Sequence, residues 1–488
     1  MKKKTDIVGS LFWSFLERVG TQAVGLIVST LLARFILPND YGIIAAATIF
    51  TGLATTFVSG GFGNALIQKK DADDKDYSTM FVFNLVFSIL VYVIVFFSAP
   101  FLVSVFSNSF DTDVLVKVVR VLGVGIIFSS FNSFYRALLT KKLLFKKLFI
   151  QTLIGNFISG TIGVILAYKG FGVWALVSQS MISYFVNSCI FVYSSKWKPK
   201  LYFSFTRFKT MFSFGLKLLI SGLMITAYTE STGLVIGNRY SSEDLAFYKK
   251  GTNYPKLIVL NLVTAINTAL FPILSSIHNK SEQVRIVRKF NRISAFVITP
   301  MMFGFAAVSP AFVELLLTEK WLSCVPFLQI CCLSYAIQPL AMSSLQYLKA
   351  DGRATEYLVL DIIRKCVGVA LIIGAVIINK SVFLIAFADV ISNFIAVFIN
   401  MYPGKKHIGY SVKQQIWDVL PKFMLSGIMF VSVWLINYID ISLFVKLVVQ
   451  IIVGVVTYLG SARLLHMKEL YEIFSMAKNI ISKKNQSV

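Results

Sequence analysis

The chain is built from long apolar runs separated by short polar or charged segments. A membrane helix needs about 20 apolar residues to cross roughly 30 Å of hydrocarbon, whereas a membrane β-barrel shows alternating segments of about ten residues. The runs here are continuous and long, so they predict an all-α polytopic membrane protein with about 14 transmembrane helices. The expected spans are 9–36, 41–67, 77–106, 114–139, 149–168, 172–194, 208–237, 243–275, 288–308, 322–349, 354–378, 381–402, 417–437 and 441–464.

The pattern repeats itself after about 210 residues. The motif Ala-Pro-Phe-Leu-Val around Pro100 returns as Ser-Pro-Ala-Phe-Val around Pro310, and the register holds as far as Leu148 and Leu358. Duplicated helical halves that face each other across a midplane cleft are a common architecture of secondary transporters. The repeat therefore favours a transporter.

The repeat predicts three parts of the chain. Residues 1–200 form an N-terminal six-helix lobe, 201–403 form a second six-helix lobe, and 404–488 form a further transmembrane hairpin with a basic cytoplasmic tail. Because each copy holds an even number of spans, the two lobes are expected in the same membrane orientation. A membrane enzyme such as a glycosyltransferase would need a sizeable outer loop with charged clusters. None is expected here, so the chain is not expected to be an enzyme.

Charge agrees with the membrane interpretation. Only 14% of the 488 residues are charged, against about 25% in soluble domains. The net charge is +24, and about thirty basic residues fall in alternate loops against four in the loops between them. This asymmetry places both termini in the cytoplasm and reflects topology and anionic lipids rather than nucleic acid. The few cysteines and histidines lack metal-ligand spacing, so no metal and no cofactor are predicted.

Several charged residues interrupt the apolar spans. A charge near the bilayer centre costs roughly 2.5–3.5 kcal/mol even on the lenient insertion scale, so such residues face protein, water or ligand. They fall on the first, seventh and eighth spans, and polar residues continue along the same helix faces. The predicted cavity residues are Glu17, Arg18, Lys217, Lys249, Lys250 and Asn261.

These positions have two interpretations. In the functional one, Arg18, Lys217 and the two lysines of the eighth span form a cationic cavity for phosphate, and Glu17 moderates its charge. In the structural one, Glu17 pairs locally and Lys249 and Lys250 extend along the helix to the outer surface. We favour the cavity for Arg18 and Lys217 and leave the lysine pair open.

Other intramembrane charges are weaker candidates. Asp361 has Arg364 and Lys365 three and four residues later, which predicts a neutralised structural ion pair. Glu230 and Asp389 are candidates for coupling to protons or sodium. Asp389 with Asn393 is also explained as a hydrogen-bonded pair between helices, and we prefer this explanation.

Three stretches resemble a known family. Leu32–Gly42, Gly61–Lys69 and Trp13–Gln22 are similar to the Wzx-type polysaccharide flippases, near the colanic-acid and teichuronic-acid exporters. These belong to the multidrug/oligosaccharidyl-lipid/polysaccharide (MOP) superfamily, which includes the MATE transporters. The resemblance covers essentially the whole chain.

The resemblance implies a MATE/MOP-like fold and a function. It implies alternating access through a cavity lined by the first, second, seventh and eighth spans, in a bacterial inner or plasma membrane. The implied substrates are undecaprenyl-diphosphate-linked oligosaccharides used for surface polysaccharide such as lipopolysaccharide or exopolysaccharide. Polymerase or export proteins are implied partners. The alternative is an ion-coupled multidrug or metabolite exporter, although basic rather than acidic cavity residues favour a diphosphate.

Overall fold

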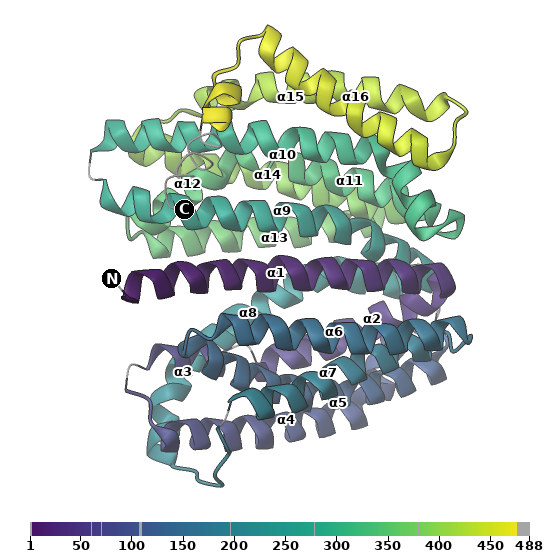
Figure 1. Cartoon of the computed structure of the whole chain (residues 1–488), viewed down its shortest axis with the longest axis vertical. Helices are drawn as coiled ribbons and strands as arrows, with labels where there is room; N and C mark the ends of the chain where they lie inside the picture. The colour runs from purple at the N-terminus through teal and green to yellow at the C-terminus, as the bar shows by residue number, and fades with distance from the viewer. Residues whose placement is uncertain are drawn as a thin grey trace. The chain divides into compact units, whose positions relative to one another are not determined.

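The computed structural model describes residues 2–59, 61–69, 71–106, 110–195, 197–277, 279–378 and 381–475. Throughout this part of the chain the regular structure is helical (Figure 1). The all-α class is therefore confirmed. The helices are α1 (Lys2–Phe35), α2 (Pro38–Ser59), α3 (Phe62–Gln68), α4 (Asp74–Val103), α5 (Thr112–Lys141), α6 (Phe145–Tyr168), α7 (Val173–Ser195), α8 (Phe205–Arg239), α9 (Ser242–Ser276), α10 (Lys280–Leu317), α11 (Val325–Ala336), α12 (Pro339–Ala350), α13 (Ala354–Ile378), α14 (Val382–Ile408), α15 (Val412–Leu435) and α16 (Leu443–Leu464), with short 3-10 helices η1 (Ser104–Phe106), η2 (Glu319–Cys324) and η3 (Ile436–Tyr438).

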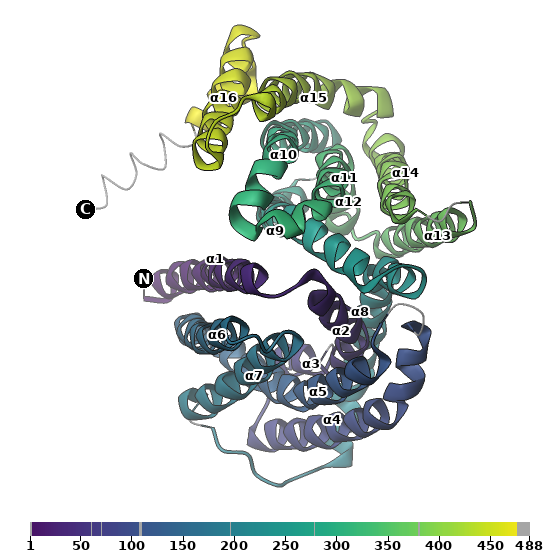
Figure 2. The same cartoon turned by 90° about the vertical axis from the view of Figure 1, so that its right-hand side faces the viewer.

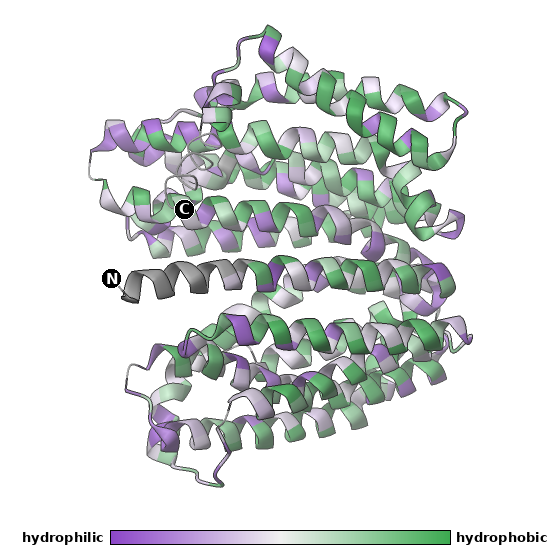
Figure 3. Ribbon diagram, viewed as in Figure 1, coloured by the Kyte–Doolittle hydropathy of each residue, from purple (hydrophilic) through white to green (hydrophobic). Residues whose placement is uncertain are grey.

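Eleven of the described helices are long and apolar enough to cross a membrane, so the count of fourteen is not confirmed. The three expected spans without such a counterpart are those at α1, at α11 with α12, and at α13. Helix α13 carries Asp361, Arg364 and Lys365, which lower its apolar character. Hydrophobic residues nevertheless predominate along most helices, and hydrophilic residues gather at several ends, including the beginning of α10 (Figure 3).

The expected span 322–349 is divided into two short helices. Helix α11 ends at Ala336 and α12 begins at Pro339, each with 12 residues. Proline has no backbone N–H and its ring clashes with the carbonyl four residues earlier, so it fits the first turn of a helix and not its interior. The break places Ile337 and Gln338 outside both helices.

The first compact unit comprises Met1–Ala246. In it α1 packs on α6, α4 packs on α5, and α8 lies beside α2 and α3 (Figure 2). A Cβ on Gly61 would lie 2.0 Å from the Gly215 carbonyl oxygen, so the backbones at the start of α3 and in α8 touch directly.

The second compact unit comprises Phe247–Val488. Helix α10 packs on α11 and α15, α14 packs on α11, α12 and α13, and α15 forms a hairpin with α16 (Figure 1). Charged hydrogen bonds hold the hairpin against α10, because the Asp418 carboxylate of α15 accepts hydrogen bonds from Arg288 and Arg292 of α10. Lys422 forms a buried ion pair with Glu469 at 2.8 Å.

Candidate functional site

In the first unit, Glu17 has a specific partner. Its carboxylate forms an ion pair with Arg136 of α5, and Glu17 is the more buried of the two side chains. Arg136 lies five residues before the end of α5 at Lys141, so the pair joins α1 and α5 near the basic loop at that end. Glu17 is therefore paired, but its partner is 119 positions away on another helix, which differs from the local pairing considered for it.

The two favoured cations of the first unit are both exposed. Arg18 directly follows Glu17 in α1, and Lys217 lies near the start of the apolar segment Gly215–Arg239 of α8. Lys217 forms no ion pair with any residue that the structure describes. Glu230 is partly buried on the same helix, and thirteen residues of straight helix separate the two by about 20 Å along the axis. Glu230 and Lys217 therefore lie at different depths.

In the second unit, Lys250 is buried against an aromatic ring. It is 7% exposed, and its Nζ lies 5.4 Å from the centre of the Trp321 ring in η2. Such a cation–π contact stabilises a desolvated cation. Lys249 is partly buried, and Asn261 of α9 donates its amide N–H to the Leu257 carbonyl at 2.9 Å.

A polar cluster surrounds Asp389 on α14. Asn393 donates to the Asp389 carboxylate at 3.3 Å and to the Ser334 hydroxyl of α11 at 2.7 Å. Lys256 of α9 is near enough for its charge to act on the Asp389 carboxylate. The hydrogen bond between helices that we preferred for Asn393 is confirmed, and ion coupling at Asp389 stays a prediction.

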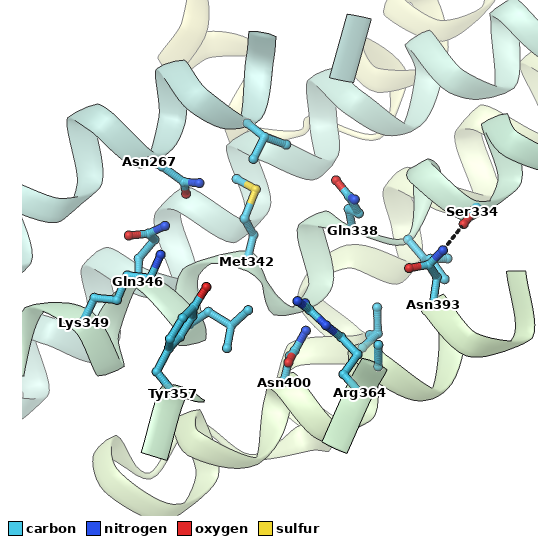
Figure 4. A pocket seen from close by; sticks show the side chains of 15 residues that line it. Asn267, Ser334, Gln338, Met342, Gln346, Lys349, Tyr357, Arg364, Asn393 and Asn400 are labelled. Atoms are coloured by element: carbon cyan, nitrogen blue, oxygen red, sulfur yellow. Dashed lines mark hydrogen bonds between the residues drawn. The ribbon is translucent and has the colours of Figure 1, made fainter. Parts of the chain in front are cut away.

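A cavity of about 210 Å³ lies next to this cluster, inside the second unit (Figure 4). Helices α9, α11, α12, α13 and α14 supply its walls. Nine of its fifteen lining residues are polar, and no acidic residue is among the described ones that line it. The lining residues are Val263, Asn267, Ser334, Ile337, Gln338, Met342, Leu345, Gln346, Lys349, Tyr357, Arg364, Asn393, Ala396, Val397 and Asn400.

Arg364 brings positive charge to the cavity. Asp361 pairs with both Arg364 and Lys365, which confirms the predicted intrahelical ion pairs. One carboxylate shared by two cations leaves a net positive charge, and Figure 4 shows the Arg364 side chain reaching into the cavity. At one side of the cavity, the Lys349 Nζ lies 4.4 Å from the centre of the Tyr357 ring.

Two buried amides also line the cavity. Gln346 is 8% exposed and Asn400 is 7% exposed, and neither forms a hydrogen bond within the described part of the chain. The hydrogen-bonding groups of both amides are therefore available to water or to a ligand in the cavity.

Sequence reasoning missed Arg136, Gln346 and Asn400. Arg136 was assigned to the end of a span, where a cation needs no explanation. The two amides carry no charge and did not stand out. A signal existed for Asn400, because Asn393 and Asn400 are seven residues apart and so share one helix face.

Comparison with known proteins identifies the family to which the chain belongs. Residues 31–326, more than half of the chain, match a family described as polysaccharide biosynthesis protein. The chain belongs to this polysaccharide biosynthesis protein family. The matched residues include Lys217, Lys249 and Lys250, whereas the parts of the cavity on α13 and α14 lie beyond them.

Two relatives of this chain agree with the family. The teichuronic acid biosynthesis protein TuaB of Bacillus subtilis is 25% identical over 354 residues, which cover 72% of each chain. The lipopolysaccharide biosynthesis protein WzxC of Escherichia coli is 25% identical over 68% of this chain and 67% of its own. The resemblance to the Wzx-type proteins is thus confirmed.

A protein of known structure has a fold similar to that of this chain. The lipid II flippase MurJ in an inward closed conformation superposes with a TM-score of 0.74 over 94% of this chain and 99% of MurJ, at 17% identity. This likeness shows a shared fold. The predicted polytopic all-helical fold is confirmed.

Proposed function

We propose that this chain is a flippase for undecaprenyl-diphosphate-linked oligosaccharide repeat units. It moves them from the cytoplasmic to the outer leaflet of a bacterial cell membrane by alternating access, with both of its termini in the cytoplasm. The observation that carries the proposal is membership of the polysaccharide biosynthesis family. The fold shared with a lipid II flippase supports it further.

Arg18 and Lys217 are proposed to bind the diphosphate. Both are exposed, and a cation in an expected membrane span faces protein, water, headgroups or an anionic ligand. The planar guanidinium of Arg18 can donate two parallel hydrogen bonds to one phosphate, while Lys217 contributes a point charge. Glu17 shares its charge with Arg136.

The remaining predicted residues take supporting roles in the proposal. Lys249 adds positive charge near the beginning of α9, and Lys250 adds a charge that is held against the Trp321 ring. Asn261 contributes polarity further along α9. Glu230 and Asp389 are proposed for coupling to protons or sodium, because carboxylates inside membrane helices commonly serve such relays. Polymerase or export proteins would receive the flipped repeat unit.

Deleting the protein and extracting the membrane lipids tests the function. We expect diphosphate-linked repeat units to accumulate on the cytoplasmic side and wild-type protein to clear them. Arg18→Ala and Lys217→Ala are each expected to lower export about tenfold or more, the scale of a lost charge-assisted hydrogen bond. Protein levels should stay unchanged.

Lys117→Ala is the matched control, because Lys117 is an exposed lysine of α5 outside the proposed site. It should export normally. If the deleted cells kept all surface polysaccharide and instead became sensitive to cationic dyes, the chain would be a multidrug exporter and the proposal would fail.

A further inference from the structure

We propose that the cavity of the second unit binds one acidic monosaccharide, such as a hexuronate, within the transported glycan. This site lies inside a single unit and is distinct from the residues proposed for the diphosphate. Its assignment to the glycan rests on the proposed function. Three properties of the cavity carry it: hydrogen-bonding capacity, charge and size.

The hydrogen-bonding groups match a sugar. A carboxamide offers both a donor and an acceptor, and each sugar hydroxyl needs both. Gln346 and Asn400 are more than nine-tenths buried and line the cavity, and the side-chain oxygen of Asn267 is buried without a hydrogen bond to any described residue. Figure 4 shows these amides around one space, contributed by three different helices.

The charge of the cavity matches a carboxylate. Arg364 and Lys349 line it, and no acidic residue does so among those described. A guanidinium has five N–H donors, and one hydrogen bond, from Nη2 to Asp361, joins Arg364 to the shared carboxylate. Arg364 therefore retains donors for a second anion, which it can hold with two parallel bonds. A neutral sugar would leave this charge uncompensated.

The volume of the cavity suits a small unit. Its volume of about 210 Å³ is below the range of roughly 300–1,000 Å³ that is usual for drug-sized ligands. A single ring fits this size better than a repeat unit or a lipid diphosphate. Met342 and Val397 supply apolar surface for the C–H face of a ring.

Binding to the purified full-length protein in nanodiscs tests the site without requiring transport. Sodium glucuronate is expected to raise the thermal unfolding midpoint, whereas glucose raises it less and sodium acetate at matched ionic strength leaves it unchanged. Asn400→Leu and Arg364→Gln should each weaken glucuronate binding about tenfold or more, the scale of lost charge-assisted or buried hydrogen bonds. Lys117→Gln, on the first unit, should bind as wild type does.

Gln346→Leu provides a second test from another helix, should Arg364→Gln disturb the pairing of Asp361. It too should weaken glucuronate binding while the unliganded protein unfolds at the wild-type midpoint. Equal stabilisation by acetate would reduce the site to an anion site without sugar recognition and overturn the proposal. Unchanged glucuronate affinity in Asn400→Leu and Gln346→Leu would overturn it as well.

A transport assay distinguishes a glycan unit from a free sugar acid. Reconstituted protein is given a lipid-linked oligosaccharide with a hexuronate, and the same molecule with its carboxyl group reduced to an alcohol. Wild type should move the acidic form faster, and Arg364→Gln should move both alike. Equal rates in the wild type would overturn the assignment to the glycan. Movement of neither form, together with intact glucuronate binding, would instead contradict the proposed flippase function.

Discussion

At the scale of single residues, two of the charges inside the expected membrane helices are explained by their contacts. Glu17 and Arg136 are 119 positions apart and form an ion pair between α1 and α5. Lys250 is buried on the Trp321 ring. Each contact offsets part of the cost of placing a charge inside a helical unit.

The Glu17–Arg136 pair leads to a residue-scale prediction. Glu17→Arg alone places two cations together, and Arg136→Glu alone places two carboxylates together, so each is expected to lower the amount of folded protein in the membrane. The double variant Glu17→Arg with Arg136→Glu restores opposite charges and should recover most of that loss. Membrane protein level and unfolding midpoint measure the effect. A double variant no better than the worse single variant would contradict the pairing.

Single residues also show which parts of the site could be predicted from the sequence. The ion pairs of Asp361 follow from helical spacing alone, and they were predicted. The Glu17–Arg136 pair depends on how α1 packs on its neighbours, which no local pattern contains. Gln346 and Asn400 could not be recognised as site residues from the sequence, because only the packing of α12 and α14 brings them to one cavity.

At the scale of elements, glycine controls how closely helices approach. The touching backbones at Gly61 and Gly215 leave no room for a side chain. Gly61→Ala should push α3 and α8 apart and lower the stability of the first unit by about 1–3 kcal/mol, as overpacking does elsewhere. The change in thermal unfolding midpoint in detergent gives the measurement.

Gly52→Ala is its control in the preceding helix of the same unit. A Cβ at Gly52 meets nothing within 4 Å, and alanine is the better helix former by roughly 0.5–1 kcal/mol. Gly52→Ala should therefore unfold at the wild-type temperature or above it. Equal destabilisation by the two substitutions would show that α3 and α8 are not in backbone contact.

At the scale of elements, one expected span was predicted wrongly from the sequence. Pro339 was visible in the middle of the expected span 322–349, and its cost inside a helix could have predicted the break between α11 and α12. Apolar character continues across the break, so hydropathy alone merged the two helices. The break shapes the cavity, because Gln338 lies in the break and lines the cavity.

At the scale of the whole molecule, hydropathy and a few motifs were enough to predict the class and the family. Continuous apolar runs predicted the helical membrane fold, and the stretches around Arg34 and Gly61 pointed to the family that the comparisons show. Tertiary sites were harder, because they depend on residues that are far apart in the chain. The cavity is one example, since five helices contribute to it.

Flipping by the purified protein tests the central claim most directly. The full chain is reconstituted in liposomes that carry an undecaprenyl-diphosphate-linked oligosaccharide in the inner leaflet, and a glycan-modifying enzyme added outside reports its arrival. We expect rapid modification with wild-type protein, and much slower modification with Arg18→Ala or Lys217→Ala. Modification no faster than in protein-free liposomes, with folded protein present, would contradict the account.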